Sequence, residues 1–130
     1  MCAIAGTLGY IDRRVLENMI SIQGHRGPDG TGKTTINLND VSRGHNRLAI
    51  IDPDCGHQPM SDGRFTVVFN GQIYNYLELR EMLSGYVFRT QTDTEVIMAA
   101  HERWGNRAPS KFIGMFAYAI WDNKHRKLML

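Results

Sequence analysis

The sequence predicts an α+β fold in which antiparallel sheet is covered by helices. Two observations lead to this prediction. Runs typical of strands outnumber the segments with helical periodicity, and several runs are joined by tight turns of the kind that connect antiparallel neighbours. Helices are then expected to bury their apolar faces against the sheet. The 130 residues suit one domain with one core.

The first part of the chain contains a strand, a helix and a loop. The apolar run at 2–8 is short and ends at a glycine, which is typical of a strand. Within 12–23 the apolar residues fall mostly at helical spacing, with Asp12 as the expected N-cap and Gly24 as the expected stop. The turn-rich stretch at 25–32 is predicted to be a loop.

A pair of strands follows at 34–38 and 41–51, around a tight turn at Asn39-Asp40. The stretch 52–63 holds two prolines, two glycines and three aspartates, so we expect a loop. It is long for a loop in a compact domain, and long ordered loops often carry function.

The third part begins with a clear strand at 64–71 that leads into a turn at Asn70-Gly71. The apolar leucines of 73–85 favour a helix that stops at the last glycine of this stretch, and 86–90 is predicted to be a short strand.

The last part opens with a helix at 92–105, whose N-cap is Thr92 or Asp93 and whose first turn contains Glu95. The aromatic and β-branched run at 112–122 favours a buried strand, and a turn then leads to a final strand that starts at 126.

Composition excludes several classes of protein. Hydrophobic residues make up 42% and charged residues 22%, which is ordinary for a globular domain. The net charge of +2 is small and scattered, so nucleic acid is not an expected partner. Two cysteines cannot build a disulfide framework, and a reduced, cytoplasmic setting is expected. No signal peptide or membrane span is predicted, so a membrane is not an expected partner either.

Cys2 is the first residue whose position points to chemistry. A cysteine directly after Met1 becomes the first residue once the methionine is removed. Its thiol then lies beside a free α-amine with a reference pKa of about 8, which can act as the base for the thiol. On its own this signal is weak, because many proteins begin with Met-Cys.

A set of motifs in order along the chain strengthens this interpretation. They are MCAIAG (1–6), HRGPDG (25–30), GHNRLAIID (44–52), QPM (58–60), FNGQIYNYLELR (69–80), TDTEVI (92–97) and GMFAYAIWD (114–122). In this order the chain resembles the class II glutamine amidotransferase domain of the asparagine synthetase family. The resemblance implies a four-layer α-β-β-α sandwich of antiparallel sheets, the N-terminal nucleophile hydrolase fold, over residues 1–130.

The resemblance also implies roles for individual residues. Cys2 attacks the side-chain amide of glutamine, while Asn70 and Gly71 hold the oxyanion. Arg47 clamps the substrate α-carboxylate, and Asp93 accepts its α-ammonium. The backbone of Leu48, Ile50 and Ile51 lines the pocket. Taken alone, each of these residues also has an ordinary structural interpretation, such as a strand residue, a hairpin turn or an N-cap.

Some positions depart from the family pattern. Ala3 stands where relatives often have glycine or serine, and Gln72 stands where a glutamate usually helps to hold the ammonium. The family domain continues beyond this chain to a synthetase domain, so we expect a partial domain with an incomplete sheet. An unpaired strand edge favours self-association, so a homodimer is among the expected states.

The glutaminase step is expected to need no metal or other cofactor. ATP and magnesium are expected only for the absent synthetase domain, which would be the partner of this one besides glutamine itself. The acceptor that the parent enzyme amidates stays open.

Three alternatives stay open at this point. The chain could be a non-catalytic module that keeps the fold. Residues 27–34 match a phosphate-loop pattern, although a helix precedes them and a β-prone run follows, which argues for chance. Cys55 and His57 with His45 could suggest a metal site, but they are too few and lack the spacing of a zinc site.

Overall fold

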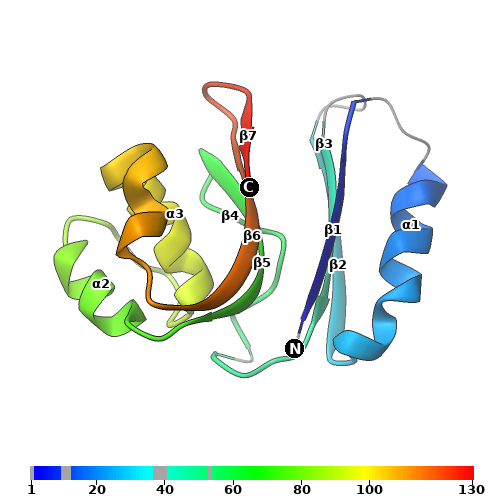
Figure 1. Ribbon diagram of the computed structural model, residues 1–130, viewed down its shortest axis with the longest axis horizontal. Helices are drawn as coiled ribbons and strands as arrows, with labels where there is room; N and C mark the ends of the chain where they lie inside the picture. The colour runs from blue at the N-terminus through cyan, green and yellow to red at the C-terminus, as the bar shows by residue number, and fades with distance from the viewer. Residues whose placement is uncertain (1, 10–12, 37–40, 53) are drawn as a thin grey trace.

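Two antiparallel sheets lie face to face in the computed structural model, and helices cover their outer faces (Figure 1). The structure describes residues 2–9, 13–36, 41–52 and 54–130. Helix α1 (Arg13–Ile22) covers one sheet, and α2 (Tyr76–Met82) and α3 (Asp93–Trp104) cover the other. The predicted α+β fold is confirmed, and the helices and sheets form four layers in the order α-β-β-α.

The first sheet has the strand order β1-β3-β2. Its strands are β1 (Ala3–Leu8), β2 (Gly30–Ile36) and β3 (Val41–Arg47). Side chains of the central strand alternate between its two faces, as a strand requires. Gly44 and Asn46 face α1: a Cβ at Gly44 would lie 1.9 Å from Ile20, and Asn46 Nδ2 donates to the Ile20 carbonyl at 2.7 Å. The alternate residues of β3, which include Arg43 and His45, therefore face the second sheet.

The second sheet has the order β4-β5-β6-β7. Its strands are β4 (Met60–Ser61), β5 (Phe65–Ile73), β6 (Gly114–Asp122) and β7 (Lys127–Met129). The larger hydrophobic core lies between this sheet and the helices α2 and α3. Strand β5 contributes every second residue to it, namely Phe65, Val67, Phe69 and Ile73 with one position skipped. The alternate residues of β5 therefore face the first sheet.

Polar bonds cross the layer between the sheets. Arg43 Nη1 donates to the Thr66 carbonyl at 2.8 Å, and His45 Nε2 lies 3.1 Å from the Phe69 carbonyl oxygen. Burial lowers the pKa of Arg43 to about 10 and the pKa of His45 to about 4. His45 is therefore neutral at pH 7 and donates its Nε2 proton to Phe69.

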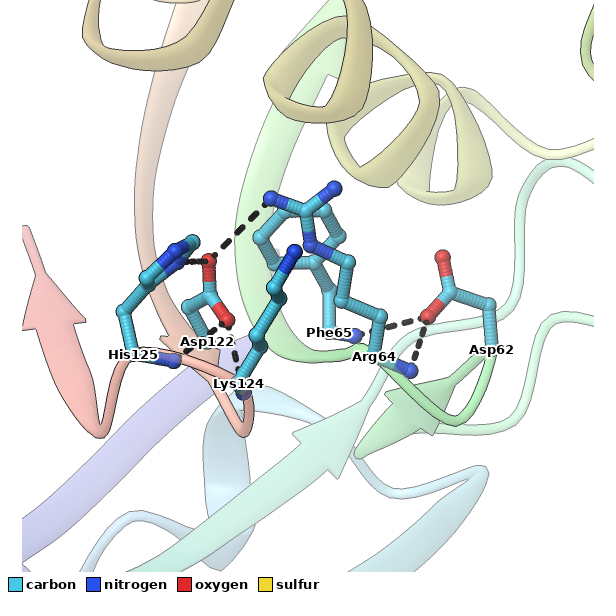
Figure 2. A network of polar contacts seen from close by, with 6 residues as sticks. All are labelled: Asp62, Arg64, Phe65, Asp122, Lys124 and His125. Carbon is cyan, nitrogen blue, oxygen red and sulfur yellow. Dashed lines mark hydrogen bonds and ion pairs between the residues drawn. The ribbon is translucent and has the colours of Figure 1, made fainter.

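A buried carboxylate closes the far end of the second sheet (Figure 2). Asp122 accepts the backbone N–H groups of Lys124 and His125 at 2.8 and 3.1 Å, and His125 Nδ1 lies 2.8 Å from its second oxygen. Arg64 reaches the same oxygen at 3.5 Å from the turn before β5. One side chain thus joins the β6–β7 turn to the β4–β5 turn.

Several expected boundaries are wrong, and backbone hydrogen bonding explains each case. The loop expected at 25–32 contains the 3₁₀ helix η1 (Gly24–Arg26) and the first residues of β2, because β2 pairs with β3 along its whole length. The strand expected at 41–51 ends at Arg47, since the next N–H groups bond to Cys2 and Asp29 side chains. The loop expected at 52–63 includes the short strand β4.

Two further expectations are corrected in the second half. Asn70-Gly71 is not a turn: both residues lie inside β5 and pair with β6. No strand forms among the described residues 86–90, because the N–H groups of Arg89 and Thr90 bond to the Glu95 carboxylate. Residues Gly105–Lys111 form the 3₁₀ helix η2, which had no predicted counterpart.

Other expectations hold or lie outside the described residues. Thr92 is the N-cap of α3, and its hydroxyl accepts the Glu95 N–H at 3.2 Å. The Asp12 cap and the Asn39-Asp40 turn lie outside the described residues. None of the helices in the described ranges combines the length and apolar character that a membrane crossing requires.

Candidate active site

A cavity of about 160 Å³ lies at the end of the layer between the sheets, beside the N-terminus of α3. An apolar cavity of about 150 Å³ is large enough to hold benzene, so this cavity suits a small side chain. All nine residues that the sequence assigned to the site line it: Cys2, Arg47, Leu48, Ile50, Ile51, Asn70, Gly71, Gln72 and Asp93. Folding therefore collects them from segments far apart in the chain.

Strand alternation explains why these side chains meet. Ala5 of β1 packs against α1, so the side chain of Cys2, an odd number of positions earlier, projects to the other side. Arg47 lies two residues after His45, so its side chain projects from the same face of β3, toward the second sheet. Asn70 and Gln72 alternate with Phe69 along β5. Because the Phe69 side chain lies in the core against α3, the other two project from the opposite face. All of these side chains therefore enter the space between the sheets.

The Cys2 thiol is docked on the peptide that follows β3. The Leu48 N–H donates to Cys2 Sγ at 3.3 Å, and Sγ lies 3.6 Å from the Leu48 carbonyl oxygen. On the other side, Arg26 Nε donates to the Cys2 carbonyl at 3.3 Å. These contacts place a half-buried thiol at the cavity wall.

The HRGPDG stretch (25–30) binds the backbone that follows β3, next to the peptide that contacts the Cys2 thiol. The Asp29 N–H donates to the Arg47 carbonyl at 3.0 Å, and Asp29 Oδ2 accepts the Ala49 N–H at 2.8 Å. A Cβ at Gly27 would lie 2.4 Å from the Asn46 backbone, so only glycine fits this close approach. Sequence reasoning did not assign Asp29 to the site, although the motif that contains it was noted.

Arg47 presents a guanidinium at the opposite wall. The residue is 8% exposed, and its Nη2 donates to the Asp52 carbonyl at 2.8 Å. A Cβ at Gly56 would lie 2.5 Å from the same nitrogen, so the turn packs closely around it. The arrangement holds a cation where a carboxylate could meet it.

Asn70 and Gly71 form the β5 side of the cavity. Gly71 has a φ of 148°, and a Cβ there would lie 2.2 Å from the Met115 carbonyl oxygen. Asn70 Oδ1 is buried, and no partner for it is found in the described part of the chain. Buried polar atoms without partners are uncommon and often mark ligand sites. This pair therefore places a side-chain amide and a glycine backbone at one point of the wall.

Asp93 closes the cavity as the first residue of α3. It is 5% exposed, and its Oδ2 accepts the Ile73 N–H at 3.0 Å. Burial raises the pKa of the carboxyl, and the backbone hydrogen bonds oppose that shift. A buried carboxylate in this position suits a cationic ligand group. Gln72 lines the same cavity with a neutral amide.

Seven further residues line the cavity and were not assigned to the site from the sequence. They are Gly56, Gln58, Phe69, Tyr74, Thr92, Thr94 and Met115. Gln58 and Thr92 lie within the quoted motifs QPM and TDTEVI, so those motifs were the available signal. Met115 lies within the quoted motif GMFAYAIWD, and the pairing of Gln72 with Met115 places it at the cavity.

The residues of the other two candidate sites have different surroundings. Residues Gly30 to Lys33 belong to β2 and lead into β3, so the helix that a phosphate loop requires does not follow. Lys33 Nζ pairs with Glu17 at 3.4 Å. Cys55 is exposed and His45 is buried between the sheets. Among the described residues, no group of three or more His, Cys, Asp or Glu is placed to hold a metal ion.

Comparison with known proteins decides the family. Residues 1–130 match the family model described as a glutamine amidotransferase domain. The chain belongs to the glutamine amidotransferase domain family. Glutamine-hydrolyzing asparagine synthetase 1 of Bacillus subtilis (strain 168) is 47% identical to this domain over 106 residues, which are 78% of the chain and 16% of that protein. Asparagine synthetase 3 of Arabidopsis thaliana is 36% identical over 137 residues, or 99% of the chain and 23% of that protein.

The amidotransferase domain thus spans less than a quarter of the length of these relatives. Among solved structures, glutamine phosphoribosylpyrophosphate amidotransferase from B. subtilis matches with a TM-score of 0.73. That match covers 94% of this chain and 35% of the other at 21% identity, so it shows a shared fold alone.

Proposed function

We propose that this domain hydrolyses glutamine to glutamate and ammonia, with Cys2 as the nucleophile. The observation that carries the proposal is the meeting of four groups in one small cavity: a half-buried thiol, an amide-glycine pair, a guanidinium and a buried carboxylate. The family match and the glutamine-hydrolysing relatives support glutamine as the substrate.

Arg47 and Asp93 would bind the amino-acid head of glutamine, the guanidinium on the α-carboxylate and the carboxylate on the α-ammonium. An arginine fork gives directional recognition of a carboxylate. Gln72 would add a hydrogen bond without charge. The substrate side chain would then extend toward Cys2.

The Cys2 sulfur would attack the side-chain amide carbon. The α-amine, free once Met1 is removed, would take the thiol proton and pass it to the leaving nitrogen, which departs as ammonia. Asn70 and the Gly71 N–H would stabilise the oxyanion, an interaction worth several kcal/mol where such donors have been removed. Water then hydrolyses the γ-glutamyl thioester, which releases glutamate and restores the thiol.

This sequence of steps uses only groups of the chain and water, so we propose no metal or cofactor for it. The relatives named as asparagine synthetases support a role in which ammonia passes to the amidation of a carboxylate elsewhere in the parent protein. ATP and magnesium would belong to that second step.

The test is the intact mass of the 130-residue chain with and without 6-diazo-5-oxo-norleucine, a glutamine analogue that alkylates the nucleophile. We expect a mass without Met1 and one adduct. Cys2→Ala should abolish the adduct, whereas Cys55→Ala, which removes the exposed second thiol, should retain it. Retained Met1, or a folded chain that takes no adduct, would instead favour a non-catalytic module.

A further inference from the structure

The stretch between β3 and β4 contacts both halves of the cavity. Asp52 contacts Arg47, where the α-carboxylate is proposed to bind. Gln58 contacts Phe69, which precedes Asn70 in β5, where the oxyanion is proposed to form. Neither Asp52 nor Gln58 needs to touch the reacting atoms, because Asp52 binds Arg47 directly and Gln58 binds Phe69, the residue before Asn70.

Asp52 is the centre of a small hydrogen-bonded network. Its carbonyl accepts Arg47 Nη2 at 2.8 Å and the Gly56 N–H at 2.9 Å. Its carboxylate accepts the Cys55 N–H at 3.2 Å and the Gln91 N–H at 2.9 Å. The network ties the turn after β3 to the residue just before the N-cap of α3, and so joins Arg47 to the end of α3 that carries Asp93.

The backbone of Asp52 needs this support. Its φ of 47° lies in the left-handed region, which few residues other than glycine, asparagine and aspartate adopt readily. The two N–H groups that bond to the carboxylate fix this conformation, and the conformation aims the carbonyl at Arg47. Loss of the carboxylate would therefore release the guanidinium without any change at Arg47 itself.

Gln58 performs a separate task at β5. Its Oε1 accepts the Phe69 N–H at 2.6 Å, at the place on the edge of β5 that β4 does not reach. Its Nε2 donates to the Thr94 hydroxyl at 3.3 Å in the first turn of α3. The Gln58 side chain thus takes the place of a strand partner one residue before Asn70, which fixes the backbone from which the proposed oxyanion donors project.

We infer that Asp52 and Gln58 are positioning residues with separable effects, Asp52 on substrate binding through Arg47 and Gln58 on the chemical step through Asn70. The inference rests on the proposed glutaminase function. An interaction made equally in ground and transition state affects KM, whereas one made only in the transition state affects kcat. The two residues should therefore give opposite kinetic signatures.

Four variants test this. Asp52→Ala removes both carboxylate bonds, and Asp52→Asn keeps one acceptor and tolerates the left-handed backbone. Gln58→Met keeps the length without polar atoms, and Gln58→Glu keeps the acceptor for the Phe69 N–H. Asp54→Asn and His57→Ala are matched controls, because both residues are exposed in the same stretch. Each protein is first checked for native circular dichroism.

In glutamine hydrolysis we expect Asp52→Ala to raise KM roughly tenfold with kcat within about twofold, the size expected for loss of one charge-assisted contact. Asp52→Asn should give an intermediate KM. Gln58→Met should lower kcat on the order of tenfold with little change in KM. This fall in kcat is smaller than the fall caused by loss of a whole oxyanion donor. Gln58→Glu should restore most of the lost kcat. A purely structural role would lower the active fraction without moving KM.

Alkylation by 6-diazo-5-oxo-norleucine gives the same separation independently of turnover. The analogue concentration at half-maximal rate should rise in Asp52→Ala, and the maximal rate should fall in Gln58→Met. Equal parameters for these folded variants and the wild type would overturn the inference. Absence of any adduct in the wild type would instead overturn the proposed function. If Asp52→Ala or Gln58→Met does not fold, Asp52→Asn and Gln58→Glu test the inference through the same KM, kcat and alkylation rates.

Discussion

At the scale of single residues, Gly71 shows how tightly the proposed oxyanion site is built. The φ of 148° and the 2.2 Å approach of a Cβ to the Met115 carbonyl oxygen are separate reasons for glycine. The first is a backbone cost, and the second is a collision with the paired strand β6. Both follow from the position of Gly71 inside β5, where it lines the cavity and pairs with β6.

Gly71→Ala is therefore expected to destabilise the domain and to abolish glutamine hydrolysis. Backbone strain of this kind costs about 1–3 kcal/mol, and the collision adds to it. Gly63→Ala separates the two costs, since Gly63 has a φ of 99° but nothing within 4 Å of its Cβ position. Urea unfolding should show a clearly larger loss for Gly71→Ala; equal losses would mean that the collision is relieved at no cost.

At the scale of elements, Asp122 decides how the last two strands meet. Its carboxylate accepts the backbone N–H groups of the β6–β7 turn and contacts His125 and Arg64 (Figure 2). Burial tends to raise the pKa of Asp122, but the hydrogen bonds from His125 and Lys124 outweigh it, so the pKa lies below its ordinary value. A short strand such as β7 depends on this turn, because it has few ladder bonds of its own.

Asp122→Ala should loosen the β6–β7 hairpin and lower the free energy of unfolding by about 1 kcal/mol at pH 7, because the N–H groups of Lys124 and His125 lose an ionised acceptor. Since the folded pKa is lowered, the contribution is present above the ordinary pKa of 3.8 and is lost as pH falls through the folded value. In Asp122→Ala, amide exchange should be faster than in the wild type, and the increase should be larger in Lys127–Met129 than in β5. Unchanged exchange in β7, with Asp54→Ala as the control, would contradict this role.

At the scale of the whole molecule, two buried histidines join the layers. His45 connects β3 to β5 across the space between the sheets, and His101 of α3 contacts the Tyr118 hydroxyl of β6 at 2.9 Å. Burial lowers the pKa of each histidine to about 4. Both are neutral at pH 7, and protonation would charge the interior of the packed layers.

The wild type should therefore lose stability as pH falls from 6.5 toward 4, because the unfolded chain takes up protons on these histidines and the folded chain does not. The loss should be about 2 kcal/mol for each histidine at pH 5. His45→Gln and His101→Gln should each show a smaller loss between pH 7 and pH 5 in denaturant unfolding. The exposed His57→Gln serves as the control, and the same pH dependence in all three variants would refute the assignment.

Part of this architecture could be predicted from local sequence. The helix expected at 92–105 corresponds to α3, and the strands expected at 2–8, 64–71 and 112–122 correspond to β1, β5 and β6, because their periodicity and caps are local signals. The boundaries that were wrong lie where a side chain outside the local pattern, or a paired strand, binds the backbone N–H groups. Glu95 binds the N–H groups of residues 89 and 90, and Asp29 and Cys2 bind those after Arg47.

The sequence by itself indicated the fold class, and its ordered motifs indicated the family and nine of the sixteen residues that line the cavity, because such motifs can be recognised without the tertiary structure. Tertiary structure alone decided that Asn70 and Gly71 stay inside a strand, and that Asp29 binds the backbone on both sides of Leu48, whose N–H donates to the Cys2 thiol. It also decided that Asp52 and Gln58 contact different parts of the site. These features depend on hydrogen bonds between segments far apart in sequence, and local propensity contains no information about which distant partner will satisfy a given N–H group.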